Sequence, residues 1–246
     1  MTKTLTNLNN ALFLQSTNLL QGLVFFSFFY SLLNIAVLQQ WWLLSLVPIA
    51  LVMNEFIISA YYHRFITHKS WECPRWLEYI LISVCTSFGF GAVIGWAGTH
   101  RNHHHKSDVP GEDPHGPTRT WWENITVFSK PPAIRYCSSM FKDKLLYNQA
   151  QYYWPLWALG ATLWSLTIGP EAYFFLVFNF FFWQIWVNIV GHTNNPLEGS
   201  GWLGSEGYHK FHHEHPNSAR FGRFDISYLL MIRWFPHTNH YRKNIA

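Results

Sequence analysis

The chain has 246 residues, enough for one domain over residues 1–246, and 49% of them are hydrophobic, 19% aromatic and 12% charged. Because an average soluble domain has about 25% charged residues, this composition favours a membrane protein. The net charge of +4 is too small to indicate a nucleic-acid partner, and three cysteines without CxxC spacing exclude a disulfide framework and a thiolate metal site.

The first predicted elements are two apolar helices near the N-terminus. The preceding segment is too polar for a signal peptide, so the first apolar run is expected to remain in the mature protein. Runs over about 19–38 and 41–62 are long enough to span a bilayer, which takes roughly 20 residues as helix. Only Gln39 and Gln40 separate them, which predicts a tight transmembrane hairpin.

The next apolar run, about 76–97, has a different character. It contains Glu78 and three glycines, so we interpret it as an interfacial or shallowly inserted segment rather than a transmembrane helix. The alternative is a fifth span. In that case residues 63–68 and 100–105 would lie on opposite sides of the membrane.

A second hairpin follows a polar, turn-rich stretch. Apolar runs over about 153–169 and 171–192 are joined by a Gly-Pro turn, and none of the 17 lysines and arginines falls in either hairpin turn. The positive-inside rule therefore places both termini, 63–152 and 193–246 in the cytosol. The predicted fold class is an all-α membrane protein with four transmembrane helices in two hairpins, an interfacial helix and a cytosolic, histidine-rich cap.

Nine of the fourteen histidines are expected at the cytosolic end of this fold: His63, His68, His100, His103, His104, His192, His209, His212 and His213. Positions i, i+3 and i+4 share one helix face, so each HxxHH group is predicted to direct three imidazoles at one metal. The spacing of His63 and His68 is poorer, because helical positions i and i+5 diverge by about 140°. We expect this pair where a helix ends and the chain bends.

So many imidazoles exceed the needs of one metal ion. Zinc is satisfied by about four ligands, and imidazole also suits iron and copper. Two ions with nitrogen ligands at a membrane surface indicate a non-haem di-iron centre that activates O2. Asn188 precedes His192 by one helical turn and is aimed at the same end. His105 would be a ligand in an alternative HxxxHH pattern, but HRNHH matches the third group better, so His105 is left out of the predicted ligands. His215, His237 and His240 are expected to be solvated.

The motifs "YHRFITHKSW", "WAGTHRNHHHKSD" followed by "EDPHGP" and "WW", "VNIVGH" and "SEGYHKFHHEHPNSAR" occur in one order over roughly residues 50 to 230. Together they resemble the membrane-bound fatty-acid desaturases, nearest the stearoyl-CoA and bacterial delta-nine type. The resemblance implies four spanning helices and a cytosolic cap. It also implies that the nine histidines bind two iron ions, that Asn188 acts through a bound water, and that Asp108, Asp113 and His115 support the cap.

The activity that the resemblance implies is O2-dependent introduction of a cis double bond, delta-9-like, into a saturated acyl chain carried on CoA, a carrier protein or a glycerolipid. Electrons would come from a separate donor such as ferredoxin or a cytochrome. A hydroxylase or acetylenase with the same di-iron site is an alternative. A metal transporter is disfavoured, because transporters place polar ligands near the midplane and only Glu55, Asn179 and Gln184 lie deep in the predicted helices.

Glu55 departs from the family pattern, which usually has a small or neutral residue there. Burying an acid in a membrane helix costs free energy, so such a residue is expected to have a function. The sequence leaves two expectations open: Glu55 lines the acyl tunnel, or it pairs with Gln21 or Asn34 of the first helix.

Overall fold

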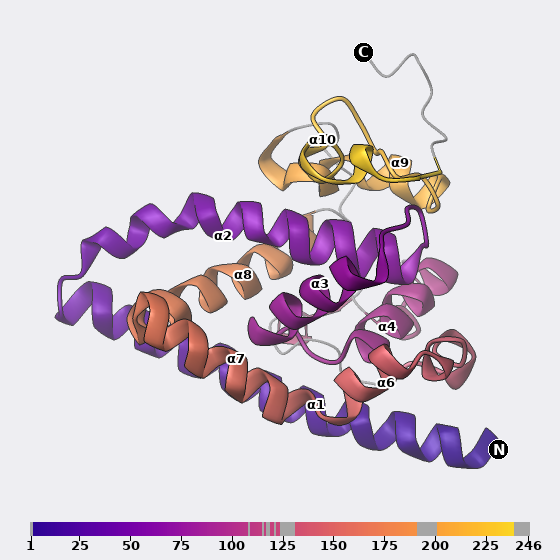
Figure 1. The fold of residues 1–246 in the computed structure, drawn as a ribbon, viewed down its shortest axis with the longest axis horizontal. Helices are drawn as coiled ribbons and strands as arrows, with labels where there is room; N and C mark the ends of the chain where they lie inside the picture. The colour runs from indigo at the N-terminus through magenta and orange to yellow at the C-terminus, as the bar shows by residue number, and fades with distance from the viewer. Residues whose placement is uncertain are drawn as a thin grey trace.

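The structure is a computed structural model that describes residues 2–107, 109–114, 116, 119–120, 122–123, 131–190 and 201–238, with the backbone alone for 2, 12–18, 188–190 and 201–204. Regular structure in these residues is helical. Four long helices converge at one end of the molecule, and the shorter helices gather at the other end (Figure 1). The described residues thus agree with the predicted all-α class.

The first hairpin has the predicted turn. One helix runs through α1 (Thr2–Leu32) and a π-helical end (Leu33–Val37), beginning well before the predicted apolar run. The chain reverses at Gln39, whose φ of 54° is in the left-handed region, and the amide of Gln40 donates to the carbonyl of Asn34 at 2.9 Å.

The second helix of this hairpin is continuous over Trp41–Thr67. It begins with a 3-10 segment (Trp41–Leu46), continues as α2 (Val47–Asn54) and ends with a π-helical segment (Glu55–Thr67). It therefore extends five residues beyond the predicted end at residue 62, and the first histidine of the chain lies inside it. That extension carries the helix from the apolar end of the molecule into the cap.

The run predicted to be interfacial is not one helix. It forms α3 (Arg75–Ser87) and the start of α4 (Val93–Lys106), joined by a turn in which Gly89 and Gly91 have φ of 81° and 89°. A Cβ on Gly89 would lie 2.3 Å from a Leu23 methyl carbon, so the turn needs glycine both for its conformation and for its close approach to α1. Neither helix alone is long enough to span a bilayer.

Buried hydrogen bonds hold this turn in place. Tyr62 Oη donates to the carbonyl of Gly91 at 3.0 Å, and the amide of Gly91 donates to Tyr153 Oη at 2.8 Å. Gln149 on α6 (Lys144–Gln151) accepts from the amide of Val93 at 3.0 Å. These bonds satisfy backbone groups that would otherwise be unpaired in an apolar core. They fix the point from which α4 enters the cap.

The second hairpin comprises α7 (Tyr153–Ile168) and α8 (Pro170–Val190), which meet at Gly169. Gly169 has a φ of 88°. Pro170 is the first residue of α8, a position whose amide makes no hydrogen bond within the helix, so proline is tolerated there. Figure 1 shows α8 running beside α1 and α2, and Phe180 and Phe181 of α8 are buried against Phe90 of the α3–α4 turn at ring distances of 4.9 and 5.4 Å.

Two helices in the described residues are long and apolar enough to cross a membrane: Leu19–Val37 and Trp41–Thr67, with mean hydropathies of 1.7 and 2.0. The second hairpin contributes no such helix among the described residues. Helix α7 has 16 residues, and the side chains of α8 are described only as far as Val187. The four-span topology therefore remains a prediction.

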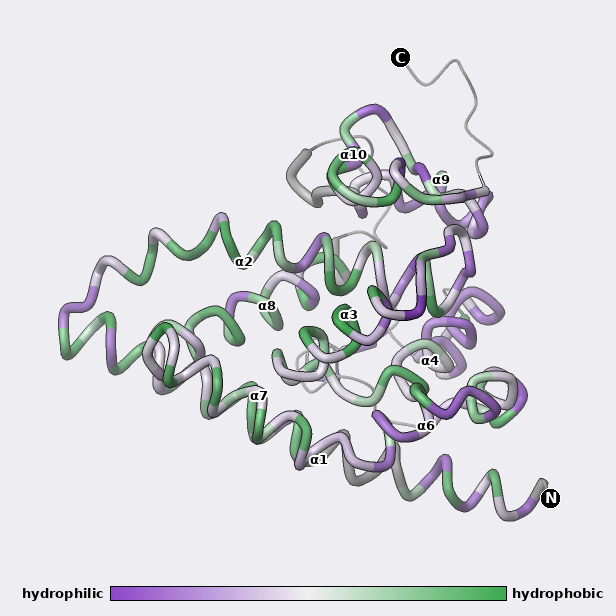
Figure 2. The backbone as a smooth tube through the Cα atoms, in the orientation of Figure 1, coloured by the Kyte–Doolittle hydropathy of each residue, from purple (hydrophilic) through white to green (hydrophobic). Residues whose placement is uncertain are grey.

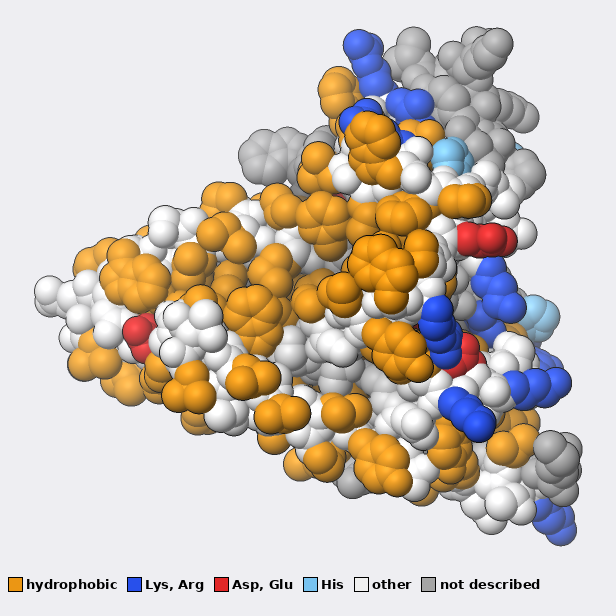
Figure 3. Space-filling model, viewed as in Figure 1, with side chains coloured by type: hydrophobic (Ala, Val, Ile, Leu, Met, Phe, Trp, Pro, Cys, Tyr) orange, Lys and Arg blue, Asp and Glu red, His pale blue; other side chains and the backbone are white. Residues whose placement is uncertain are grey.

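Charge is segregated on the molecule. Hydrophobic side chains cover the narrow end of the face drawn in Figure 3, whereas lysines and arginines gather at the opposite end. The hydropathy colouring of Figure 2 shows the same division along the backbone, with apolar residues concentrated in the four long helices. This division is the one that a protein partly embedded in a bilayer requires.

Candidate metal centre

The first histidine pair lies where the second helix becomes π-helical. The amide of His68 donates to the carbonyl of His63 at 3.1 Å, an i to i+5 bond. Because π-helical winding brings residues five apart onto nearly the same face, the two imidazoles converge, with ring centroids 5.0 Å apart. The pair lies at a helix end, as expected, since the helix ends at Thr67 and His68 is its C-cap; π-helical winding there brings the two imidazoles together.

Helix α4 supplies the second histidine group and α9 (His209–Glu214) the third. The prediction that each HxxHH group serves one metal was wrong, because adjacent positions on an α-helix diverge by about 100°. Each group is instead divided between two clusters. On α4, His100 and His104 face one cluster and His103 faces the other; on α9, His212 faces the first and His209 and His213 face the second.

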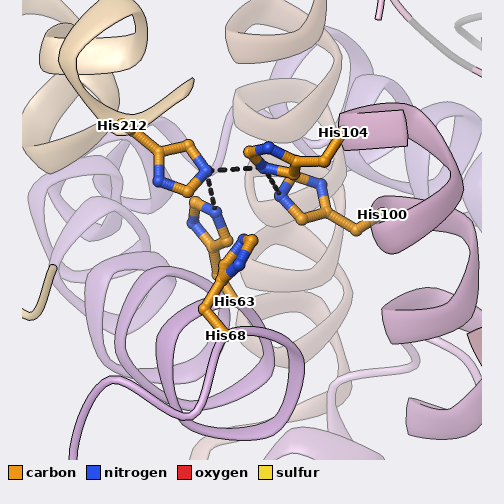
Figure 4. A group of neighbouring side chains, drawn as sticks. All are labelled: His63, His68, His100, His104 and His212. Atoms are coloured by element: carbon orange, nitrogen blue, oxygen red, sulfur yellow. Dashed lines mark hydrogen bonds between the residues drawn. The ribbon is translucent and has the colours of Figure 1, made fainter. Parts of the chain in front are cut away.

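The first cluster contains five histidines from three segments: His63, His68, His100, His104 and His212. One ligand atom from each lies within 4.8 Å of the others. Nε2 of His212 is 2.8 Å from Nε2 of His63 and from Nε2 of His104, which is itself 3.1 Å from Nε2 of His100 (Figure 4). Their ring nitrogens thus surround one small volume.

The second cluster contains His103, His209 and His213, whose ligand atoms also lie within 4.8 Å of one another. Nε2 of His213 is 2.9 Å from Nε2 of His209 and 3.2 Å from Nε2 of His103. The two clusters are adjacent, because His104 of the first and His213 of the second stack with ring centroids 4.5 Å apart. The arrangement suits two neighbouring metal ions.

A carboxylate holds one histidine of each cluster. Nδ1 of His63 lies 3.1 Å from Oε1 of Glu206, and Nδ1 of His103 lies 2.8 Å from Oδ1 of Asp113. A neutral imidazole that donates its Nδ1 hydrogen to a carboxylate presents the Nε2 lone pair to a metal. Both carboxylates are buried, so water does not compete for these bonds.

The charge of Glu206 is maintained despite its burial. Burial alone would raise its pKa, but the attraction of His63, hydrogen bonds from His63 and Ser59, and the nearby Arg64 lower the pKa to about 2. Ser59 donates its hydroxyl to the same carboxylate oxygen at 2.6 Å. Glu206 is therefore an ionised acceptor at neutral pH. Sequence reasoning missed it, although an acid three residues before His209 was a visible signal.

Three histidines of the first cluster are held in the neutral form that binds metals. Burial, followed by repulsion from neighbouring imidazoles, lowers the pKa of His68, His100 and His212 well below the usual value of 6.5. Nε2 of His68 is buried and has no hydrogen-bond partner among the described residues, although part of the side chain is accessible. A buried lone pair without a donor costs free energy that a bound cation would recover. The donor set is therefore suited to a metal.

Not every predicted site residue can be placed. His192, Asp108 and His115 lie outside the described residues, and Asn188 is described only as part of the backbone of α8. Asp113 is placed beside His103, as reported above.

The histidines predicted not to be ligands lie outside both clusters where the structure describes them. His105 is exposed, and His215 packs against Phe211 with ring centroids 4.6 Å apart. His237, also predicted to be solvated, is partly exposed and partly held by the backbone. It is half-buried, its Nδ1 lies 2.7 Å from the carbonyl of Phe235, and an antiparallel bridge joins it to Trp71.

Glu55 also differs from expectation. Its carboxyl group accepts hydrogen bonds from Ser205 and Ser227 of the C-terminal part of the cap rather than pairing with Gln21 or Asn34. Asn34 donates to the carbonyl of Tyr30 instead. The sequence could not show this, because the partners of Glu55 lie 150 and 172 residues further along the chain.

No protein-family model matches the chain. The chain is 30% identical to an sn-1 stearoyl-lipid 9-desaturase of Anabaena variabilis over 67% of its own length and 68% of the relative's. It is 31% identical to a protein of the same name from Synechocystis, over 67% of its length and 58% of the relative's. It is also 26% identical to Delta-9 acyl-lipid desaturase 1 of Arabidopsis thaliana, over 78% of the chain and 72% of that protein.

Proposed function

Because the chain belongs to the fatty acid desaturase family and is thus an oxidoreductase, we propose that it is an O2-dependent acyl desaturase with a non-haem di-iron centre. The observation that carries this proposal is the pair of adjacent histidine clusters, each anchored by a buried carboxylate. The relatives' names specify 9-desaturation of stearoyl-lipid and acyl-lipid substrates, which supports a delta-9-like reaction on an acyl lipid rather than on acyl-CoA or an acyl carrier protein.

Two iron ions would occupy the two clusters. The first would be held by His63, His68, His100, His104 and His212. The second would be held by His103, His209 and His213, together with His192 and, through a water molecule, Asn188. The nitrogen-only character of the described clusters supports a transition metal, since imidazole suits iron, copper and zinc whereas magnesium and calcium prefer oxygen.

When bound and reduced by two electrons from the donor, the iron pair would supply the O2 chemistry that removes two hydrogens from adjacent methylenes; with two protons from solvent, the products are a cis double bond and two water molecules. The protein's own contribution is positioning. Glu206 and Asp113 keep the Nδ1 hydrogen on His63 and His103, so that Nε2 points inward. Trp96 stacks on His100 with ring centroids 5.1 Å apart and covers the first cluster on its apolar side.

The proposed topology has four transmembrane helices and places both termini and the metal centre in the cytosol. It is supported by the two apolar helices of the first hairpin and by the α7–α8 hairpin that packs against them. His63 and His68 lie at the end of the second helix opposite the turn at Gln39, and the other clustered histidines lie on α4 and α9 of the cap. Electrons would come from a separate donor such as ferredoxin or a cytochrome.

The proposed function is tested by expressing the chain in a host that lacks its own desaturase and analysing the lipid fatty acids with location of the double bond. We expect a cis monounsaturated product with the double bond at carbon 9. The His104→Ala variant is the matched inactive control. Hydroxylated or acetylenic products would overturn desaturation while leaving the di-iron site intact. A chain that binds no iron and yields no product would overturn both.

A further inference from the structure

Glu55 lies in the second helix, in the part that is apolar enough to cross a membrane, and is 3% exposed. Its carboxylate meets three donors. The amide of Ser205 is 3.1 Å from Oε1, the hydroxyl of Ser205 donates to Oε2, and the hydroxyl of Ser227 lies 2.8 Å from the same oxygen. The amide of Ser227 in turn donates to the hydroxyl of Ser205 at 3.0 Å. Both serines are fully buried.

The residues that contact Glu55 are next in sequence to residues that hold the histidine clusters. Ser205 is followed by Glu206. The carboxylate of Glu206 contacts Ser59 and His63, which lie about one and two helical turns beyond Glu55 on the same helix. The 3-10 segment that contains Ser205 (Gly201–Tyr208) runs without interruption into α9, which carries three of the clustered histidines. A shift of Ser205 along the helix would therefore shift Glu206 and α9 with it.

The same C-terminal segment has a second anchor beyond α9. Arg64 contacts both carboxylate oxygens of Asp225 at 2.8 and 2.9 Å and donates to the carbonyl of Ala219 at 3.0 Å, and its guanidinium lies over the ring of Phe221. Glu55 holds the C-terminal segment on both sides of α9, at Ser205 and at Ser227, and Arg64 adds a contact after α9 at Asp225. The two anchors lie on either side of His63 along the sequence of a single helix.

We propose that Glu55 is a positioning residue for the metal centre: it sets the register of the C-terminal segment on the second helix, and so the spacing between the two histidine clusters. A carboxyl group suits this role because its two oxygens can accept several hydrogen bonds at once. The cost of placing an acid in an apolar helix is then offset by three buried donors that need an acceptor. The inference rests on the proposed di-iron function.

The test compares purified full-length Glu55→Ala and Glu55→Gln with the unmodified chain, using ferrous iron alone as the probe. We expect Glu55→Ala to lose about 10-fold in affinity for iron, the lower end of the effect of groups that orient ligands, and to change the Mössbauer spectrum of the iron that remains. Glu55→Gln keeps an acceptor oxygen and should recover part of the affinity and of the spectrum. Leu43→Ala is the control, because Leu43 is buried near the other end of the same helix, against Ala172 and Phe175.

The control separates positioning from general loss of stability. Leu43→Ala is expected to lower the unfolding temperature while leaving iron affinity and spectrum unchanged. If Glu55→Ala does not fold, Glu55→Gln and Ser227→Ala decide the question by the same two measurements. Wild-type affinity and an unaltered spectrum in the Glu55 variants that fold would overturn the inference while leaving the di-iron proposal standing. An unmodified chain that binds no iron would overturn the di-iron proposal itself.

Discussion

His103 and Asp113 form an enclosed pair: Nδ1 of His103 lies 2.8 Å from Oδ1 of Asp113, and neither side chain is exposed. His63 and Glu206 repeat the arrangement in the other cluster. Asp113 follows α4 in the same segment as its histidine, whereas Glu206 comes from a segment 143 residues away. Each cluster thus has one imidazole whose tautomer and orientation are set by a buried carboxylate.

Replacing Asp113 by alanine is expected to weaken iron binding by roughly 10- to 100-fold, because His103 would lose the partner that fixes its tautomer. Iron titration of the purified variant measures this directly. Glu112→Ala is the neighbouring control, since Glu112 is exposed and pairs with Lys106. Equal iron affinities in the two variants would show that the Asp113 contact does not orient a metal ligand.

Metal-free protein should lose stability on mild acidification. His68, His100 and His212 have pKa values well below 6.5 in the folded chain, so they stay neutral while the unfolded chain takes up protons. The free energy of unfolding is therefore highest, as far as these histidines are concerned, above about pH 6.5, and it decreases as the pH falls below that value. Unfolding temperatures of chelator-treated protein between pH 8 and pH 5 measure this effect. A stability that rises on acidification would mean that these imidazoles are charged in the native state.

The helices and the histidine groups were predictable because they depend on local patterns. Apolar length identified the two hairpins, whereas the break in the intervening run at Gly89 and Gly91 was not predicted, although glycines there were a visible signal. The division of each HxxHH group between two clusters was not predicted. It follows from helix geometry, because adjacent histidines on an α-helix point about 100° apart and so reach two neighbouring clusters. His103 and His104 are neighbours in sequence but face different clusters.

The remaining features depend on contacts between distant segments. The π-helical winding that aligns His63 with His68 leaves no simple signature in sequence, and Glu55 has partners that come near it only after the C-terminal segment has folded onto the second helix. Burial also changes what a residue can do. Arg64 looks like one more cytosolic cation in the sequence, yet it is an enclosed ion-pair partner of Asp225.

The Arg64–Asp225 pair yields a prediction for stability. Both side chains are fully buried, so Asp225→Ala would leave an uncompensated guanidinium inside the cap and should cost about 3–5 kcal/mol of unfolding free energy. It would also remove the N-terminal cap of α10 (Ile226–Leu230), where Asp225 accepts from the amide of Tyr228. Unfolding in mild detergent measures the loss. Restoration by the double variant Arg64→Met, Asp225→Ala would support the charge argument, and equal instability of the double variant would contradict it.

The membrane topology can be tested with single cysteines. Cys73 is the native thiol with some exposure, so it is first replaced by serine, while Cys85 and Cys137 are buried. Cysteines at Lys69 and Lys106, beside the first and second histidine groups, should both react with an impermeant reagent from the cytosolic side. A cysteine at Gln39, in the first hairpin turn, should react from the opposite side. Labelling of positions 69 and 106 from different sides would contradict a shared cytosolic site.

Two adjacent histidines give a closely matched comparison. Nε2 of His104 lies 2.8 Å from Nε2 of His212 inside the first cluster, whereas His105 is exposed and its ring lies 5.9 Å from that of Tyr136. His104→Ala is expected to abolish desaturation and to lower the iron content, because it removes one nitrogen donor from a five-histidine cluster.

His192→Ala should behave in the same way if His192 completes the second cluster, while Asn188→Ala should impair activity with less loss of iron. His105→Ala should retain its iron and most of its activity, since only a solvent-facing side chain is lost. Iron content per chain and fatty-acid product, measured on the same preparations, decide the matter: a fully iron-loaded, fully active His104→Ala protein would remove the first cluster from the metal centre.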